Sequence, residues 1–250
     1  MIRIKSPDEI NKIEKASKIV AELLLKIEEI IVKGISTYDL EKYALEFIEK
    51  KEALPACKGY HGFPYALCVS VNDTVIHGFP SKNEILCEGD LVSVDCVVNK
   101  DGFYGDSTKT FVIDKFINEE DRILFNKTKE SLYNAIKIAK AGNHIGDLGN
   151  IVSDTVIPSG LSVIREYSGH GVGLKMHEDP SIPNYGRKGT GPLIRNGMTL
   201  AIEPMIVEGS PNIYVEEDGW TVKTVDKKKA AHFEHTIVVE KNGPRILTAV

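Results

Sequence analysis

The sequence lacks any run of about 18 apolar residues, the length that a membrane-spanning helix needs. Its first residues also lack the apolar region of a secretory signal peptide and lead directly into a helix-start pattern. Positive charge is not in excess, because 31 Lys and Arg residues face 36 Asp and Glu residues in a chain of 250. The one tight basic run, residues 227–229, is more typical of an exposed hairpin tip than of a contact with an anionic partner such as ribosomal RNA. These absences predict a cytoplasmic protein that neither crosses a membrane nor binds nucleic acid stably.

Cysteine is also scarce. The four cysteines form no C-x-x-C pair and lie at no zinc-finger spacing from histidine, so we expect reduced, buried thiols at Cys57, Cys68, Cys87 and Cys96. The remaining composition, 42% hydrophobic and 27% charged, is that of a globular chain and excludes disordered, collagen-like and coiled-coil proteins. A chain of this length buries roughly 70–75% of its unfolded surface, enough for one large domain or two intimate halves.

Two helix-start signals open the chain. Ser6 and Glu9 supply an N-cap and a capping-box glutamate, and apolar residues follow at helical spacing as far as Gly34. Ser36 caps a second predicted helix that ends before Pro55. Later helices are expected at residues 118–141 and 145–156, and short β-branched segments predict antiparallel strands at residues 67–71, 91–98, 108–113, 162–167, 199–207, 221–225 and 231–239.

Helices followed by strands thus occur twice, with a seam near residues 114–119. This order predicts an α+β protein made of two halves, approximately 1–115 and 116–250, that share one sheet surface in a single domain 1–250. The halves show no residue-level similarity, so the repeat holds for the order of elements alone. A cleft between two such halves is a favourable place for a site.

Two aspartates flank a predicted hairpin turn. Asp95 lies in an apolar strand, and Asp106 follows the turn signal at residues 99–102. A loop at residues 100–101 would set the two carboxylates directly opposite each other, whereas a loop at residues 101–102 would make them diagonal neighbours on one face. Because such close carboxylates repel, they need a cation or a shared proton between them, unless Asp106 instead faces water.

Two glutamates lie in equally apolar segments later in the chain. Glu203 precedes Pro204, which must sit at a strand edge or bulge. Glu234 shares one face with His232 and Thr236 by strand alternation. Four carboxylates outnumber the few basic residues of these strands, and unpaired buried charge is costly. Two divalent cations would neutralise all four, so the pattern favours a metal centre with two ions.

Three histidines accompany these carboxylates. His170 lies in the glycine-rich loop 168–173, His177 follows it, and His77 lies in residues 75–80. The glycines do not complete a dinucleotide-binding fingerprint, and neither the H-E-x-x-H zinc motif nor the deaminase motif is complete. Because a single histidine of this kind is more often a structural residue, the residue pattern alone does not assign the three.

Taken together, these segments resemble those of the type I methionine aminopeptidases, in the minimal prokaryotic form. The resemblance runs from Ile4 to about Val239, and its motifs are residues 75–80, 92–96, 101–109, 168–173, 176–186, 201–205 and 233–236. It implies the pita-bread fold, in which two pseudo-symmetric α+β halves surround a curved antiparallel sheet.

The resemblance also implies roles for individual residues. Two divalent ions (Co, Mn, Fe, Zn or Ni) are expected on Asp95, Asp106, His170, Glu203 and Glu234, with Asp106 and Glu234 bridging. Asn72 and Thr74 match a loop that binds a monovalent cation in relatives. The substrate-binding residues are expected to be Cys57, Tyr60, Phe63, Cys68, His77, Met176, His177 and Trp220, with Met176 where relatives can carry an aromatic residue.

The function so implied is removal of the initiator methionine from nascent proteins whose second residue is small and uncharged. A bridging water or hydroxide would attack the first peptide bond, with Glu203 as general base. His177 would polarise the scissile carbonyl, and His77 would contact the scissile amide nitrogen. We expect a monomer that contacts nascent methionyl peptides and, transiently, the ribosome.

Two alternatives remain at this point. One is an Xaa-Pro aminopeptidase-like enzyme of the same fold, although those enzymes usually carry a large domain before the catalytic helices with which this chain begins. The other is a noncatalytic binding protein of the same fold, which the complete set of ligand types and the negative net charge disfavour. Metal content separates an enzyme from a binding protein.

Overall fold

The computed structural model describes residues 1–249. Its helices are α1 (Pro7–Ile30), α2 (Thr37–Lys50), α3 (Glu119–Ile138) and α4 (Ile145–Val156), with short 3₁₀ turns at Tyr60–Gly62 and Ile157–Ser159. Both predicted caps form, because Ser6 with Glu9 and Ser36 with Asp39 make reciprocal capping boxes. The helix predictions are therefore confirmed, with ends within a few residues of those expected. Within the described residues, none of these helices is long and apolar enough to span a membrane.

The strands pair antiparallel throughout. The first group is β1 (Leu54–Pro55), β2 (Leu67–Val71), β3 (Thr74–Ile76), β4 (Leu91–Lys100) and β5 (Phe103–Val112). The second is β6 (Ser162–Val163), β7 (Ser168–Gly171), β8 (Glu178–Pro183), β9 (Thr199–Ile202), β10 (Met205–Val207), β11 (Ile213–Val215), β12 (Val222–Thr224), β13 (Ala230–His232), β14 (His235–Glu240) and β15 (Gly243–Ile246). β4 pairs with β1, β2 and β5, and the other sheets run β13-β10-β6, β11-β12-β3 and β15-β14-β9-β7-β8.

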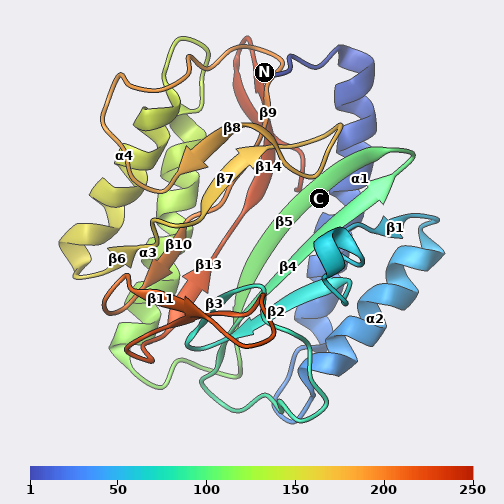
Figure 1. Ribbon diagram of the computed structural model, residues 1–250, viewed down its shortest axis with the longest axis vertical. Coiled ribbons are helices and arrows are strands. Elements are labelled where there is room, and N and C mark those ends of the chain that lie inside the picture. The colour runs from blue at the N-terminus through green and yellow to red at the C-terminus, as the bar shows by residue number, and fades with distance from the viewer. Residues whose placement is uncertain (250) are drawn as a thin grey trace.

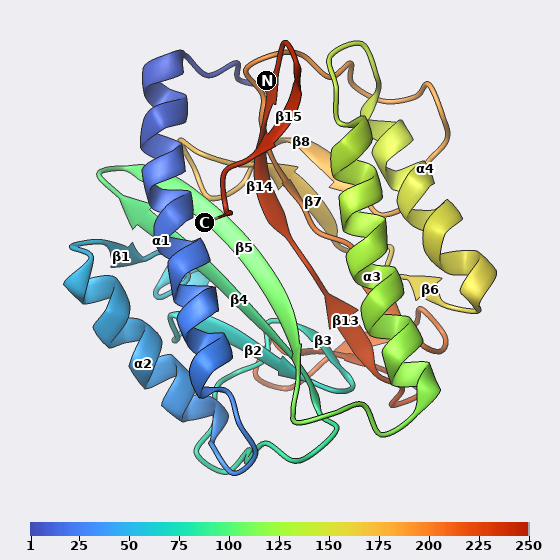
Figure 2. The same cartoon turned by 180° about the vertical axis from the view of Figure 1, so that it is seen from behind.

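The helices cover one face of the strands. Seen from behind in Figure 2, α1 and α2 stand in front of the strands on one side, and α3 and α4 on the other. In Figure 1 the strands lie in front, so this face is free of the helices. One hydrophobic core lies beneath α1 and α2, and a second beneath α3 and α4. The α+β prediction is confirmed, and the expected seam falls between the end of β5 and the start of α3.

Two strands that were expected to be continuous are in fact broken. The segment 199–207 splits into β9 and β10 at Glu203 and Pro204, and the segment 231–239 splits into β13 and β14 at Phe233 and Glu234. At each break the chain leaves one sheet and enters another, since β9 pairs with β14 while β10 pairs with β13. Both glutamates therefore lie at junctions between two sheets. The alternation of polar and apolar residues along a single strand does not predict such a junction.

The β4–β5 hairpin settles which face the two aspartates share. Its loop is Asp101 and Gly102, with φ of 53° and 84°, the left-handed pair that a two-residue hairpin turn requires. Asp95 consequently pairs with Thr108, and Asp106 with Val97. The carboxylates are diagonal neighbours on one face, and the directly opposed alternative is wrong.

Two expectations about surface residues need correction. Cys57, Cys68 and Cys96 are buried free thiols, but Cys87 is exposed in the segment that leads into β4. Lys229 is not part of a fully solvated hairpin tip, because its Nζ lies 3.0 Å from the Asp121 carboxylate and donates to the Gly89 carbonyl. These contacts tie residue 229 to α3 and make its role structural.

Gly105 gives a stability prediction. It lies on the face of β5 that packs against α1, and a Cβ there would come within 2.3 Å of the Ser17 backbone nitrogen. Because a helix backbone cannot rotate away, we expect Gly105→Ala to lower the free energy of unfolding by about 3 kcal/mol or more. Gly102→Ala is the control, because a Cβ at this position meets nothing within 4 Å. This variant should lower the free energy of unfolding by only about 1–2 kcal/mol, the cost of a left-handed backbone conformation for alanine. Equal denaturant midpoints for the two variants would contradict this packing.

Candidate active site

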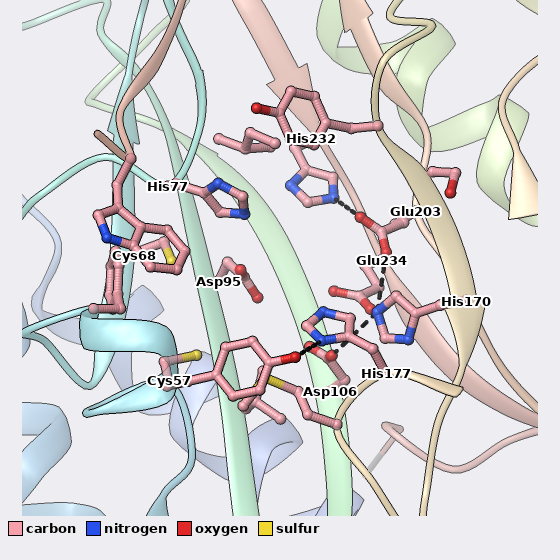
Figure 3. A pocket seen from close by; sticks show the side chains of 18 of the residues that line it. Cys57, Cys68, His77, Asp95, Asp106, His170, His177, Glu203, His232 and Glu234 are labelled. Carbon is pink, nitrogen blue, oxygen red and sulfur yellow. Dashed lines mark hydrogen bonds and ion pairs between the residues drawn. The ribbon is translucent and has the colours of Figure 1, made fainter. Parts of the chain in front are cut away.

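A cavity of about 320 Å³ opens among the strands. It is lined by all of the residues expected to bind the divalent ions or the substrate or to act in catalysis, namely Cys57, Tyr60, Phe63, Cys68, His77, Asp95, Asp106, His170, Met176, His177, Glu203, Trp220 and Glu234. Figure 3 shows that the carboxylates and His170 converge from several separate strands. The structure therefore brings this set together, while Asn72 and Thr74 are not among the lining residues and the individual roles remain predictions.

The carboxylates reach the cavity from both halves of the chain. Asp95 and Asp106 come from β4 and β5, Glu203 from the β9–β10 junction, and Glu234 from the β13–β14 junction. Asp106 and Glu234 are 3% and 2% exposed. Burial, reinforced by repulsion from neighbouring carboxylates, raises the pKa of Asp106, Glu203 and Glu234 well above the usual range. So many converging acids need either bound protons or a cation among them.

The geometry fits a divalent cation. One ligand atom from each of Asp106, His170 and Glu234 can be chosen so that all three lie within 4.8 Å of one another. His170 Nε2 is 3.3 Å from Glu203 Oε1 and 3.7 Å from Asp106 Oδ2. Among residues 1–249, Asp95 Oδ1 and Glu234 Oε1 are buried without a hydrogen-bond partner. An oxygen-rich set with one imidazole suits Mn, Fe, Co, Ni or Zn, so the residues present fit a metal centre.

Hydrogen bonds hold these ligands in place. The Thr108 hydroxyl donates to Glu234 Oε2 at 2.9 Å, and the Thr236 hydroxyl donates to the Asp106 carbonyl at 2.8 Å. His170 Nδ1 lies 2.9 Å from the Gly171 carbonyl, to which it donates when protonated. The lone pair of His170 Nε2 then faces the carboxylates, the tautomer that metal binding needs.

Two further histidines border the cluster. His177 Nδ1 is 2.9 Å from the Tyr60 hydroxyl, and the His177 ring lies 4.4 Å from the His170 ring between centroids. His77 occupies a left-handed backbone position, φ 58°, which is uncommon for a residue with a side chain. Burial lowers the pKa of His77 to about 4 and also lowers that of His177, so both are neutral at pH 7. Neutral imidazoles beside an acid cluster can donate hydrogen bonds without adding charge.

The remaining wall is apolar. Cys57, Phe63, Cys68 and Met176 belong to one hydrophobic cluster, against which Tyr60 and Trp220 pack. Phe63 and Trp220 meet edge to face at 5.2 Å between ring centroids. Hydrogen bonding to Cys57 and burial raise the pKa of the Cys68 thiol well above its usual value, so it behaves as an apolar group. The result is a slot for a flexible apolar side chain beside the acids.

Sequence reasoning missed some of the cavity residues. His232 was placed on the same face as Glu234 but received no role, although its ring lines the cavity. Glu166, Tyr167 and Ser168 also line it. Tyr167 packs edge to face on His77, and the local sequence gave no signal for this contact because the two residues lie far apart in the chain.

Comparison with known proteins bears on this arrangement. The model of metallopeptidase family M24 matches residues 11–241. A methionine aminopeptidase of Clostridium acetobutylicum is 45% identical over 248 residues, which cover 99% of this chain and 99% of the relative. The crystal structure of a methionine aminopeptidase from Thermotoga maritima has a TM-score of 0.98 at 49% identity and matches 100% of both chains. A prolidase from Pyrococcus furiosus has a TM-score of 0.78 at 24% identity, covering 99% of this chain and 65% of the prolidase.

Proposed function

The chain belongs to the methionine aminopeptidases of metallopeptidase family M24, and from this membership we propose that it removes the initiator methionine from nascent proteins whose second residue is small and uncharged. One observation carries the proposal: five candidate metal ligands converge beside an apolar slot in a single cavity. The fold and hydrolase predictions are confirmed, and the noncatalytic alternative is wrong. The Xaa-Pro peptidase alternative has support from likeness of fold alone.

We infer that Asp95, Asp106, His170, Glu203 and Glu234 would hold two divalent ions, for both of which Asp106 and Glu234 would serve as ligands. When bound, such ions lower the pKa of water and supply a hydroxide nucleophile near neutral pH. The chemical identity of the ions is open among Mn, Fe, Co, Ni and Zn. A monovalent cation beside Asn72 and Thr74 is a further part of the proposal.

The protein side chains supply the other steps. Glu203 faces His170 on one side of its carboxylate, and it would accept the proton of the attacking water and pass it to the leaving amine. If the Tyr60 hydroxyl donates to Nδ1 of His177, Nε2 carries the proton and donates to the carbonyl oxygen as negative charge develops there. His77 would contact the scissile amide nitrogen. The apolar slot positions the methionine side chain.

Selectivity at the first residue follows from the slot. Its sulfur-containing and aromatic walls fit an unbranched side chain, so methionine should be preferred over the branched leucine and over charged residues. We expect kcat/KM for Met-Ala peptides to exceed that for Leu-Ala peptides by about 10-fold or more, the discrimination that one misplaced methyl group commonly gives. Faster cleavage of Leu-Ala than of Met-Ala would overturn the assignment of the slot.

The activity itself is tested by methionine release from peptides that begin Met-Ala and Met-Lys. The metal-loaded protein should release methionine rapidly from the first and slowly from the second. An N-acetylated Met-Ala peptide is the matched control, because an aminopeptidase must bind a free amino group. Release from the acetylated peptide, or none from Met-Ala, would contradict the proposal.

The remaining expectations complete the proposal. We infer that residues 1–250 act as one catalytic domain in two halves and that the protein works as a monomer in the cytoplasm. Its partners would be nascent methionyl chains and, transiently, the ribosome that carries them. A stable complex with nucleic acid or a membrane is not part of the proposal, given the negative net charge of −5.

A further inference from the structure

His232 is a cavity residue to which the mechanism above gives no task. It is the last residue of β13 and is 3% exposed. Its ring projects into the cavity on the far side of Glu203 from His170 (Figure 3). A buried imidazole that lines a catalytic cavity has either a packing role or a chemical one, and its contacts distinguish them.

The Glu203 carboxylate lies between two imidazoles. Its Oε1 is 3.3 Å from His170 Nε2, and its Oε2 is 3.4 Å from His232 Nε2. Figure 3 marks both contacts with dashed lines. One oxygen therefore faces the group of Asp106, His170 and Glu234, while the other faces His232. The two oxygens of Glu203 are therefore in different surroundings.

The backbone of His232 is fixed independently of its ring. Its N–H donates to the Thr110 hydroxyl oxygen at 3.0 Å, and the Thr110 hydroxyl donates back to the His232 carbonyl at 2.7 Å. On the opposite strand it pairs with Met205, which lies two residues after Glu203. The backbones of His232 and of the residues beside Glu203 are thus held across the same sheet junction, which places the imidazole of His232 next to the carboxylate of Glu203.

The Nε2 atom of the His232 ring lacks a hydrogen-bond partner in residues 1–249. Within the described chain, His232 Nε2 is buried and makes no hydrogen bond, since 3.4 Å is a long contact. An unsatisfied buried donor is costly, and a movement of a few tenths of an ångström would satisfy it on Glu203. Metal ligands are commonly oriented in this way by an outer hydrogen-bond partner.

We propose that His232 is a positioning residue that donates Nε2–H to Oε2 of Glu203 and thereby keeps Oε1 turned toward His170 and the metal ligands. The inference rests on the proposed function, because it gives Glu203 its orientation as ligand and proton acceptor. His232 lies outside the expected ligand set and would act only through Glu203. Its removal frees the carboxylate to rotate while the ligand set stays complete.

The test compares His232→Leu with His232→Gln. Leucine keeps the volume and loses the donor, whereas glutamine carries an amide N–H near the position of Nε2. With the leucine variant we expect kcat to fall about 10- to 100-fold with KM unchanged, the usual effect of losing an outer partner. Glutamine should restore kcat to within about threefold of the parent protein. Both variants should bind the parent number of ions.

A second measurement does not depend on turnover. In the cobalt-loaded proteins, the visible absorption of Co²⁺ reports its ligand geometry, so the leucine variant should shift the spectrum and the glutamine variant should restore it. Equal losses of kcat in both variants, an unchanged kcat in the leucine variant, or a lost ion would each overturn the proposal. If the parent protein releases no methionine, the proposed function fails, while the cobalt spectra still test the positioning of Glu203.

Discussion

Removal of divalent metal ions will reduce methionine release to the background rate of the buffer. In the proposed mechanism the side chains bind, orient and move protons, and Glu203 accepts the proton of the attacking water, but no side chain lowers the pKa of that water. Lowering the pKa of a bound water from about 15.7 to about 7 is among the largest single contributions available to a hydrolase. The loss on chelation should therefore be complete rather than partial.

The measurement follows methionine release from a Met-Ala peptide before and after dialysis against a chelator, with metal content determined by elemental analysis. Adding back Mn²⁺ or Co²⁺ should restore the rate, which separates metal loss from unfolding. The circular dichroism of the chelated protein provides a second control. Full activity in a sample shown to be free of metal would refute the metal-dependent mechanism.

Replacing His177 by alanine will lower kcat and kcat/KM together, by about 10²–10³, as the loss of one oxyanion donor does in other enzymes. The reason is geometric, because His177 is oriented by Tyr60 and lies beside His170 without belonging to the expected ligand set. The metal content should therefore stay unchanged. Glu234→Gln is the matched contrast, since it alters a shared ligand and should reduce metal content as well as rate.

Three measurements on His177→Ala decide its role: kcat, bound metal per chain and melting temperature. If His177 only braces the loop at residues 168–173, the melting temperature should fall while kcat at low temperature stays near normal. Loss of metal together with rate would make His177 a ligand, against the assignment. Retained metal with a large loss of kcat supports its role at the carbonyl oxygen.

The helices could be predicted from the sequence because their determinants are local. Ser6 and Ser36 each form a capping box with a residue three positions later, so a short stretch of sequence is enough to predict the start of each helix. β7 and β8 could not be predicted, since Ser168–Gly171 and Glu178–Pro183 lack apolar alternation and depend on pairing with distant strands. The strand breaks at Glu203 and Glu234 likewise depend on long-range pairing, because the residues before and after each break pair with strands of different sheets.

The site, like the fold, has some residues whose placement could be predicted from local sequence and others whose placement depends on long-range packing. The shared face of Asp95 and Asp106 follows from turn length and strand alternation, which are readable in a short segment. The placement of His170, His177 and Trp220 followed from resemblance to a family, because their approach to the carboxylates is set by long-range packing. The contact between His232 and Glu203 could not be predicted, because it depends on the pairing of β13 with β10.

The exposed turn at Asp101 and Gly102 constrains the chain more than its position on the surface suggests. It lies about 20 Å along the strand from Asp95, yet it fixes which residues of β5 face the cavity and which face α1. One inserted residue would either form a bulge within the turn or exchange the orientations of Gly105 and Asp106, placing a carboxylate against the α1 backbone. Surface loops usually tolerate changes of length, but in this one the length of the loop is a condition for assembling the catalytic cavity.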